Sequence, residues 1–591
     1  AITSTPEELN IIDGGTSATS TTVADADRVV MNDNGTMVQV AVTDLSAYFD
    51  DEITAMPNLV TVGAGGTASS VAGIPFYSLS NSIYTHDVSG TDDTAQYNSA
   101  YGLTAMDAIT TGDENTAFGY AALGALNTGT RNVAFGSNAL DNNTSGDFNT
   151  AVGRTALSAN TTADGNTAVG FNALAANTTG TRNIAIGHNA YDASDTENDN
   201  LAIGYNAMTT NTAGGTENTA IGNYALDALT SGDNNTAVGM NAGGALTTGG
   251  NNTAIGRASL LIATTASDNT AVGRNAMNQT TTGSNNTAVG SSALDANTTG
   301  HENTAFGRYA LKDNTDGEEN TAVGNAAGES ITTGDYNTAV GSSALATATG
   351  GSYNTAVGKD ALKVNVANNN TAFGYNTLTA NTTGADNTAI GKDVMYTATT
   401  GDDNIAIGVN AAGLLTSASD TVAIGNYALD SLTTGESNTG VGHQVLTRNT
   451  TGRYNTAVGR GSMEDVTTGY QNTAHGYYSG SSITEGLNNI MIGSTAGDLT
   501  TTGSRNIVIG AGADAPANST NDALNIGGWI IGVAGQITMP NQPAFFATKS
   551  EDNADLAINT NHVAIFDTEI FDQNADFASN VFTAPVTGKY Q

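Results

Sequence analysis

A pentapeptide, Asn-Thr-Ala-(Val/Ile/Phe)-Gly, recurs with small variations through most of the chain at a nearly constant spacing. Its closing glycine occurs 26 times between Gly102 and Gly527, and the mean interval is 17 residues. Only two intervals depart from this spacing: Gly204 to Gly222 is longer by one, and Gly358 to Gly374 is shorter by one. Disordered low-complexity sequence has no reason to keep such a register, so the repeat predicts a solenoid over residues 98–527, with one repeat in each of 26 coils.

The content of one repeat predicts how a coil is built. Side chains alternate along a strand, so the second and fourth motif positions share a face. The second position exchanges Thr for larger aliphatics, and we therefore expect this face to be buried. A Leu four residues after the glycine predicts a second short strand, and a later Thr-Thr-Gly predicts the return turn, with Gly at positive φ. In a representative unit the structural positions are Asn286, Thr287, Val289, Gly290, Leu294 and Gly300.

The first motif position is Asn in 24 of the 26 repeats and fails only at Thr421 and Ala523. One interpretation is a ladder of polar side chains that binds a ligand. The other is that each Asn is buried in a turn and hydrogen-bonds backbone groups of its own and neighbouring coils. We favour the structural interpretation, because a binding site rarely needs 24 identical copies.

Stacked strands lie about 4.8 Å apart, so 25 steps predict a rod on the order of 120 Å long. One coil has room for only a few inward aliphatic side chains and buries little surface alone. We therefore expect chains to associate through the Ala-rich sides of the coils. Trp529 directly follows the last coil and is expected to be an apolar cap on the open end of the sheet.

The charge balance limits the partners of such a rod. Seventeen basic and 56 acidic residues give a net charge of −39, which disfavours nucleic-acid binding. The chain has no Cys, and therefore no disulfide, thiolate nucleophile or Cys-ligated zinc. No apolar run reaches the roughly 18 residues of a membrane span, and we expect no membrane insertion. No Ser/His/Asp set, phosphate loop or isolated carboxylate pair stands out from the repeat, so we expect neither an enzyme nor a cofactor.

Two weaker signals concern metal ions. Acidic turns such as Asp402-Asp403 are candidates for calcium, but no EF-hand or nonapeptide calcium pattern is present, and a solvated negative surface is favoured. His475 replaces the aliphatic residue at the fourth motif position. In a threefold assembly its copies would form a candidate axial ion site, although a single His satisfied in the core is the favoured interpretation.

Thr421-Val-Ala-Ile-Gly425 and Asn404-Ile-Ala-Ile-Gly408 resemble the Ser-Val-Ala-Ile-Gly core of trimeric autotransporter adhesin heads. The Asn-Thr-Ala-Val-Gly form with long Asn-Thr-Thr-Gly turns is even more similar to bacteriophage tail-fibre shafts. The resemblance implies an all-β fold, a left-handed parallel β-roll, and three identical chains side by side in a homotrimeric fibre.

The two ends refine this resemblance. In the N-terminal region (1–97), Thr5 to Gly14 is similar to an attachment element of phage tail fibres. Residues 28–31 and 37–42 predict a β-hairpin, residues 44–55 predict a short helix, and 58–97 are a connector. After a neck (528–542), residues 543–591 resemble the opening strands of the complement and tumour-necrosis-factor jelly-roll head. The Phe582-Thr-Ala-Pro-Val-Thr-Gly-Lys-Tyr590 segment is its most specific mark, and we expect this head to be incomplete.

These features predict a structural adhesive fibre, a phage tail fibre in the virion tail. Its partners would be other copies of the chain, a tail or baseplate protein at the N-terminal end, and a host glycan or outer-membrane receptor at the C-terminal end. The first alternative is a bacterial surface adhesin of the trimeric autotransporter type. The second is an ice-binding β-solenoid, since Thr repeats at strand spacing; the expected inward position of the Thr argues against it.

Overall fold

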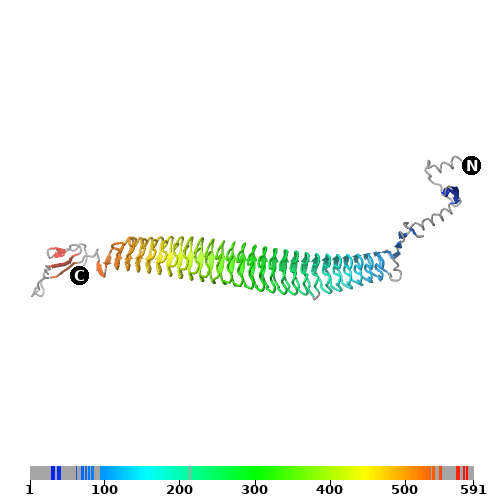
Figure 1. Ribbon diagram of the computed structural model, residues 1–591, viewed down its shortest axis with the longest axis horizontal. Coiled ribbons are helices and arrows are strands. Elements are labelled where there is room, and N and C mark those ends of the chain that lie inside the picture. Colours follow the sequence, from blue (N-terminus) through cyan, green and yellow to red (C-terminus); the bar gives the residue numbers. More distant parts are fainter. Residues whose placement is uncertain are drawn as a thin grey trace, which may run out of the picture. The chain divides into compact units, whose positions relative to one another are not determined.

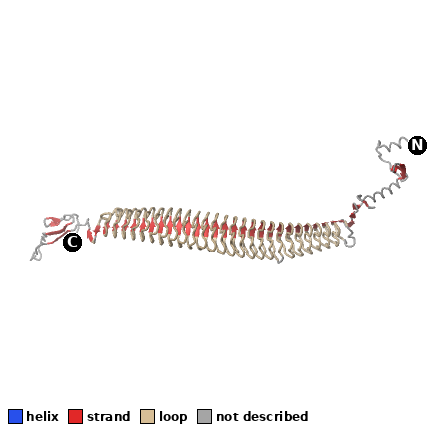
Figure 2. Ribbon diagram, in the orientation of Figure 1, coloured by secondary structure: helices blue, strands red, loops and turns tan. Residues whose placement is uncertain are grey.

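The computed structural model describes two compact units, residues 1–186 and 187–591, which are treated one at a time. The described residues are 28–33, 36–41, 61–62, 68–71, 74–75, 77–79, 82–85, 94–211, 214–533, 535–538, 545–548, 568–572, 577–578 and 581–582. Among them every regular element is a strand (Figure 2). None of them belongs to a helix long and apolar enough to cross a bilayer.

The first unit begins with the expected hairpin. Strand β1 (Arg28–Asp33) pairs antiparallel with β2 (Thr36–Ala41), and the helix predicted over 44–55 lies outside the described residues. Three short antiparallel strands follow, β3 (Thr61–Val62), β4 (Ala68–Val71) and β5 (Ile74–Pro75). Then β6 (Tyr77–Leu79) pairs antiparallel with β7 (Ser82–Tyr84), which starts a parallel ladder with β8 (Ser99–Tyr101). The ladder continues through β9 (Thr116–Phe118), β10 (Val133–Phe135), β11 (Thr150–Val152), β12 (Thr167–Val169) and β13 (Ile184–Ile186).

The second unit repeats this parallel ladder with one strand in each coil (Figures 1 and 2). Its strands are β14 (Leu201–Ile203), β15 (Thr219–Ile221), β16 (Thr236–Val238), β17 (Thr253–Ile255), β18 (Thr270–Val272), β19 (Thr287–Val289), β20 (Thr304–Phe306), β21 (Thr321–Val323), β22 (Thr338–Val340), β23 (Thr355–Val357), β24 (Thr371–Phe373), β25 (Thr388–Ile390), β26 (Ile405–Ile407), β27 (Val422–Ile424), β28 (Thr439–Val441), β29 (Thr456–Val458), β30 (Thr473–His475), β31 (Ile490–Ile492) and β32 (Ile507–Ile509). With β8–β13 and the following β33, the two units hold about 26 turns, which confirms the predicted parallel β-solenoid of 17-residue coils.

The parallel ladder ends at β33 (Ala523–Ile526). Strand β34 (Ile530–Val533) pairs antiparallel with β33, and β35 (Gln536–Thr538) pairs antiparallel with β34. Beyond these strands, β36 (Phe545–Thr548) pairs with β37 (Thr568–Asp572), and β38 (Phe577–Ala578) pairs with β39 (Val581–Phe582). These two antiparallel pairs are the described part of the segment predicted to open a jelly-roll, which stays a prediction.

The prediction of a second strand in each coil is wrong. After Gly290 the chain makes consecutive turns, because Ser292 and Leu294 adopt positive φ angles of 53° and 51°. A strand needs extended backbone at every residue, and alternate left-handed residues prevent it. The turns still bond to the next coil: the Leu294 amide donates to Ala310 O at 3.0 Å, and the Ala296 amide to Lys312 O at 2.9 Å.

The expected orientation of the strand is also wrong. Ala288, the third motif position, is fully buried, whereas Thr287 and Val289 are partly exposed on the opposite face. Ala293 and Leu294 from the turn segment complete the interior of the coil. The expectation that chains associate through the Ala-rich side is therefore wrong, because these Ala side chains are buried inside the coil. The coil is so narrow that a methyl group fills the space behind the strand, and the larger β-branched residues therefore face outward.

The two repeated glycines have different causes. Gly290 has φ +142°, and a Cβ there would lie 2.4 Å from Gly307 O in the next coil. Gly300, predicted at positive φ, is not in the left-handed region; a Cβ there would meet Gly317 O at 2.4 Å and Asn297 Oδ1 at 2.5 Å. The left-handed residue of this turn is Glu302, at φ 59°. Close stacking of coils therefore explains the glycine at position 300.

Candidate functional surfaces

The first motif position forms a buried hydrogen-bond ladder, as the structural interpretation predicts. Asn286 is fully buried, and its Oδ1 accepts the amide of Asn303 at 2.9 Å. Its Nδ2 donates to Gly300 O at 2.9 Å, and its own amide donates to Asn269 Oδ1 at 2.9 Å. Each Asn thus supplies an acceptor for the next coil and a donor for its own return turn. We call these residues the motif Asn column.

A second set of buried Asn residues escaped the sequence analysis. It lies seven residues after the motif glycine, where Asn297 donates to Gly300 O and its Oδ1 accepts Asn314 Nδ2, both at 3.0 Å. Unlike the motif position, this second Asn column alternates with buried aliphatic residues such as Leu229, Ile331 and Val466. Its Asn members among the described residues are Asn143, Asn160, Asn177, Asn211, Asn297, Asn314, Asn365, Asn381 and Asn449. The sequence signal for this column is the recurrence of either Asn or an aliphatic residue seven positions after the motif glycine.

The outer face of the strands carries a stripe in which the fourth motif position is apolar in every described coil except that of His475, whereas the second is mostly Thr. Its members are the second and fourth motif positions, and the aliphatics that replace Thr there are among the exposed residues, including Val133, Ile184 and Ile405 at 39%, 39% and 41%. In the first unit, the Tyr101, Phe118 and Phe135 rings stack in successive coils with centroids 4.8 and 4.7 Å apart. We call this face the strand stripe. Carboxylates are absent from it in the described coils.

His475 lies on the strand stripe and not in the core. It is exposed at the end of β30, in register with Val458 on one side and Ile492 on the other. The interpretation as a satisfied core histidine is therefore wrong, and an ion site shared by several copies stays a prediction. Within the described residues no group of three or more His, Asp or Glu side chains is placed to hold a metal ion.

Trp529 occupies the turn between β33 and β34, where its amide donates to Ile526 O at 2.9 Å. Its side chain is 63% exposed. The free edge of β33 is instead occupied by β34, which continues the sheet with antiparallel pairing. A role for the indole in capping the shaft stays a prediction.

A polar cluster fills the coil that precedes the one lengthened interval, Gly204 to Gly222. Tyr191 replaces the usual Leu, and its buried Oη accepts Asn200 Nδ2 at 2.6 Å and Asn211 Nδ2 at 3.1 Å. Burial raises the pKa of Tyr191 above its usual range. The nearly buried carboxylate of Glu197 accepts Ser194 Oγ at 3.1 Å and the amide of Gly214 at 3.1 Å. Because these groups satisfy one another, we assign the cluster a structural role.

An open hollow of about 690 Å³ lies on the second unit, lined by residues of the turn segments that follow β15, β16 and β17. It exists because Gly244 and Ala245 lie between the larger side chains of neighbouring coils, including Tyr224, Leu261 and Ile262. Its one carboxyl group is Asp227, whose pKa is raised by burial. The other titratable side chain of the lining is the phenol of Tyr224, and Asn241 is its remaining polar side chain.

No protein-family model, curated protein or solved structure matches the chain.

Proposed function

We propose that the chain is a non-catalytic structural fibre protein, a phage tail fibre in which three copies associate side by side through their strand stripes. The observation that carries the proposal is the exposed stripe itself. It repeats in every coil, whereas the buried polar groups of a coil are largely satisfied within the chain. Exposed, contiguous apolar surface of this kind marks an interaction site.

A second copy of the chain fits this stripe better than an unrelated partner. The stripe repeats at the strand spacing of about 4.8 Å, and another copy carries the same repeat over the same number of coils. Closed rotational symmetry would place the stripes of three copies around a common axis. The acidic turns, such as those of Asp233 and Asp335, would then remain in water and keep the assembly soluble.

In this proposal the shaft is a spacer between two ends. The N-terminal segment attaches to the tail or baseplate, and the C-terminal segment, whose sequence resembles the start of a jelly-roll head, carries the tip that contacts a host glycan or outer-membrane protein. Three tips on each fibre raise the avidity without a tight single site.

The association is tested by light scattering on the full chain. We expect a mass about three times the 59.5 kDa of one chain, and a mass of one chain would refute the proposal. Phe306→Glu places a charge on the strand stripe, where the ring is 57% exposed, and should shift the mass toward the single chain. The matched control is Leu414→Glu, an exposed apolar side chain (41%) off the stripe, which should leave the mass unchanged.

The biological assignment is tested with an antibody against residues 98–527. Bacteria that carry the coding sequence are induced, and immunogold labelling is examined by electron microscopy. Gold on phage tails supports the tail fibre. Gold confined to the bacterial envelope overturns it in favour of a surface adhesin.

Ice binding is a second candidate, because the argument that placed Thr inside the coil is wrong. The second motif position is Thr in every strand from β15 to β25, and these residues lie on the outer face in parallel register. The full chain should then inhibit ice recrystallisation at micromolar concentration, and no inhibition would remove this candidate. A trimer that buries the strand stripe excludes it, since the same Thr cannot face both ice and another chain.

A further inference from the structure

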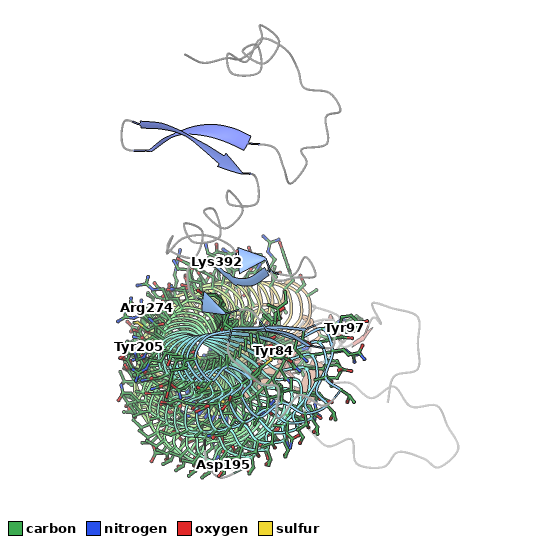
Figure 3. All side chains as sticks on the ribbon, turned by 90° about the vertical axis from the view of Figure 1, so that its right-hand side faces the viewer. Tyr84, Tyr97, Asp195, Tyr205, Arg274 and Lys392 are labelled. Carbon is green, nitrogen blue, oxygen red and sulfur yellow. The ribbon has the colours of Figure 1, made fainter. Side chains whose placement is uncertain are left out.

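Two columns of exposed residues flank the strand stripe. The strand-start column is the residue before the first motif position, and the strand-end column is the residue after the motif glycine. In the coil of β18 these residues are Asp268 and Arg274, both exposed. In Figure 3 Tyr205 and Arg274, two members of the strand-end column, project outward on the same side of the second unit, and Asp195 lies elsewhere on its rim.

The chain places its charges unevenly between these columns. The strand-end column, taken from Leu103 to Ala511, includes seven of the 17 Lys and Arg residues of the chain, and none of its 56 Asp and Glu residues. The basic members are Arg154, Arg257, Arg274, Arg308, Lys359, Lys392 and Arg460. The strand-start column of the same coils includes nine acids, which are Glu114, Asp199, Glu217, Asp268, Glu302, Glu319, Asp386, Asp403 and Asp420. One edge of the stripe is therefore basic and the other largely acidic.

Several of these cations have no acidic partner among the described residues of their own chain. Arg257, Arg274 and Arg460 are exposed and form no ion pair with any described residue. Lys359 and Lys392 reach only the adjacent Asp360 and Asp393, at 3.6 and 3.4 Å. Because the rest of the chain is so acidic, a cation that projects at the edge of an apolar stripe is placed to meet an anion of another molecule.

Rotational symmetry determines which edges meet. When identical stacks surround an axis parallel to their length, all strands run around that axis in the same sense. The end of each strand then faces the start of the corresponding strand in the next copy, at the same height. The strand-end column of one copy therefore lies against the strand-start column of its neighbour, coil by coil.

Of the seven basic strand-end residues, this symmetry brings three against an acid, three against an aromatic ring and one against Asn. A coil with a basic strand-end residue never has a basic strand-start residue; its strand-start residue is Asp, Glu, Asn or aromatic. The pairs are Phe148 with Arg154, Asn251 with Arg257, Asp268 with Arg274, Glu302 with Arg308, Tyr353 with Lys359, Asp386 with Lys392, and Tyr454 with Arg460. Aromatic rings are suitable partners because a cation binds over their faces. Conversely, the three coils that start with Arg131, Arg182 or Arg505 end with Ser137, His188 and Ala511.

We infer that copies of this chain associate in parallel and in register, with the basic strand-end edge of each copy paired to the acidic or aromatic strand-start edge of the next. This inference rests on the proposed side-by-side association. Each rim pair is exposed and contributes little energy alone. Repeated along the shaft, the pairs disfavour antiparallel arrangements, which would place the basic strand-end column against its own copy. The register follows from closed rotational symmetry, which keeps equivalent coils at the same height, because a shift of one coil would still place Arg257, Arg308 and Lys392 opposite Asp268, Glu319 and Asp403.

The absence of Cys from the chain permits a direct test. The full chain carrying Asp268→Cys and Arg274→Cys is treated with a bismaleimide too short to join the two edges of one chain. Those edges are six positions apart and flank the three-residue strand β18, so they are separated by a distance on the order of 15 Å. We expect covalent species of two and three chains in denaturing gels, and no larger species. Either single variant should give none, because each then presents a thiol on one edge only.

Register is tested by Asp268→Cys with Arg308→Cys, two coils apart and offset by roughly 10 Å along the stack. This pair should cross-link much less than the in-register pair, and equal yields would overturn the inference. A trimeric mass without in-register cross-links would refute the edge pairing and leave the trimer standing. A single-chain mass would refute both. Circular dichroism checks that each variant is folded.

Charge exchange gives an independent measurement. Arg274→Glu with Arg308→Glu should dissociate the assembly at lower protein concentration, and so should Asp268→Arg with Glu302→Arg. Combining all four substitutions should restore association, because opposite charges face each other again. Failure of the fourfold variant to recover would contradict the pairing. The control is Lys312→Glu with Asp316→Arg, which exchanges charges off both edges and should have no effect.

Discussion

Two columns of Asn run through the interior of the coils, and they differ in how often another residue replaces Asn. The motif Asn column is interrupted only at Thr421 and Ala523, whereas the second Asn column exchanges Asn for Leu, Ile, Val and Ala. In the motif column each Oδ1 accepts a backbone amide of the next coil, as Asn286 does for Asn303. In the second column the Oδ1 of Asn314, Asn381 and Asn449 has no hydrogen-bond partner among the described residues.

The difference shows what makes a buried polar residue necessary in a solenoid. A strand start leaves a backbone amide that no neighbouring carbonyl reaches, and only a side-chain acceptor can satisfy it. Among the described members of the second column, only Asn143 and Asn211 accept a backbone amide, from Gly146 at 3.1 Å and from Gly215 at 3.2 Å. The other members bond mainly to a nearby carbonyl and to one another. An aliphatic residue can replace them without leaving the backbone unsatisfied.

The largest effect is expected for Asn455→Leu in the motif column. The change removes the acceptor of the Asn472 amide at 3.0 Å and the donor to Gly469 O at 2.8 Å. Both groups are buried, and leaving them unpaired should cost about 3 to 5 kcal/mol. Hydrogen exchange should show lost protection of the Asn472 amide and its neighbouring coils. Unchanged protection would mean that the ladder is dispensable.

Asn449→Leu, six residues away in the preceding coil, should have a smaller effect of opposite sign. The Asn449 Oδ1 has no hydrogen-bond partner among the described residues. Its Nδ2 donates at 3.1 Å to Gly452 O, which also accepts Asn438 Nδ2 at 2.8 Å. The adjacent coils carry Leu432 and Val466 at this column. Replacing an incompletely bonded amide with an aliphatic group should stabilise the coil by about 1 kcal/mol. A destabilisation equal to that of Asn455→Leu would remove the distinction between the two columns.

The same distinction explains how much the sequence could reveal. The period, the parallel register and the structural role of Asn286 follow from regular spacing alone. Regular spacing also shows that Thr287 and Val289 share a face, but not which face is inside, because β-branched residues suit both surfaces of a sheet. The coil width decides this, and it depends on the turn around Ser292 and Leu294, whose left-handed φ angles have no marker as clear as Gly. Asn297 was missed because its column mixes polar and aliphatic residues.

The smallest expected effect concerns a carboxyl that replaces an apolar residue at the end of the shaft. Asp514 lies four residues after Gly510, where most coils have Leu or Met, and its Oδ1 accepts the Leu499 amide at 3.1 Å. Burial, with a smaller contribution from the charge of Asp498, raises the pKa of Asp514 to about 6. A folded-state pKa above the unfolded value means that the folded state binds the proton more tightly. Stability is therefore lost as the pH rises from about 4 through 6 and is regained on acidification.

Hydrogen exchange in residues 493–527, corrected for intrinsic rates, should accordingly show more protection at pH 5 than at pH 7. The effect is small because the carboxyl is partly exposed. Asp514→Asn keeps an acceptor for Leu499 and should abolish the pH dependence, whereas Asp498→Asn should shift it to lower pH. If the pH dependence of protection survives Asp514→Asn, another group titrates. A neutral amide would then stabilise the end of the shaft no better than a carboxylate does at neutral pH.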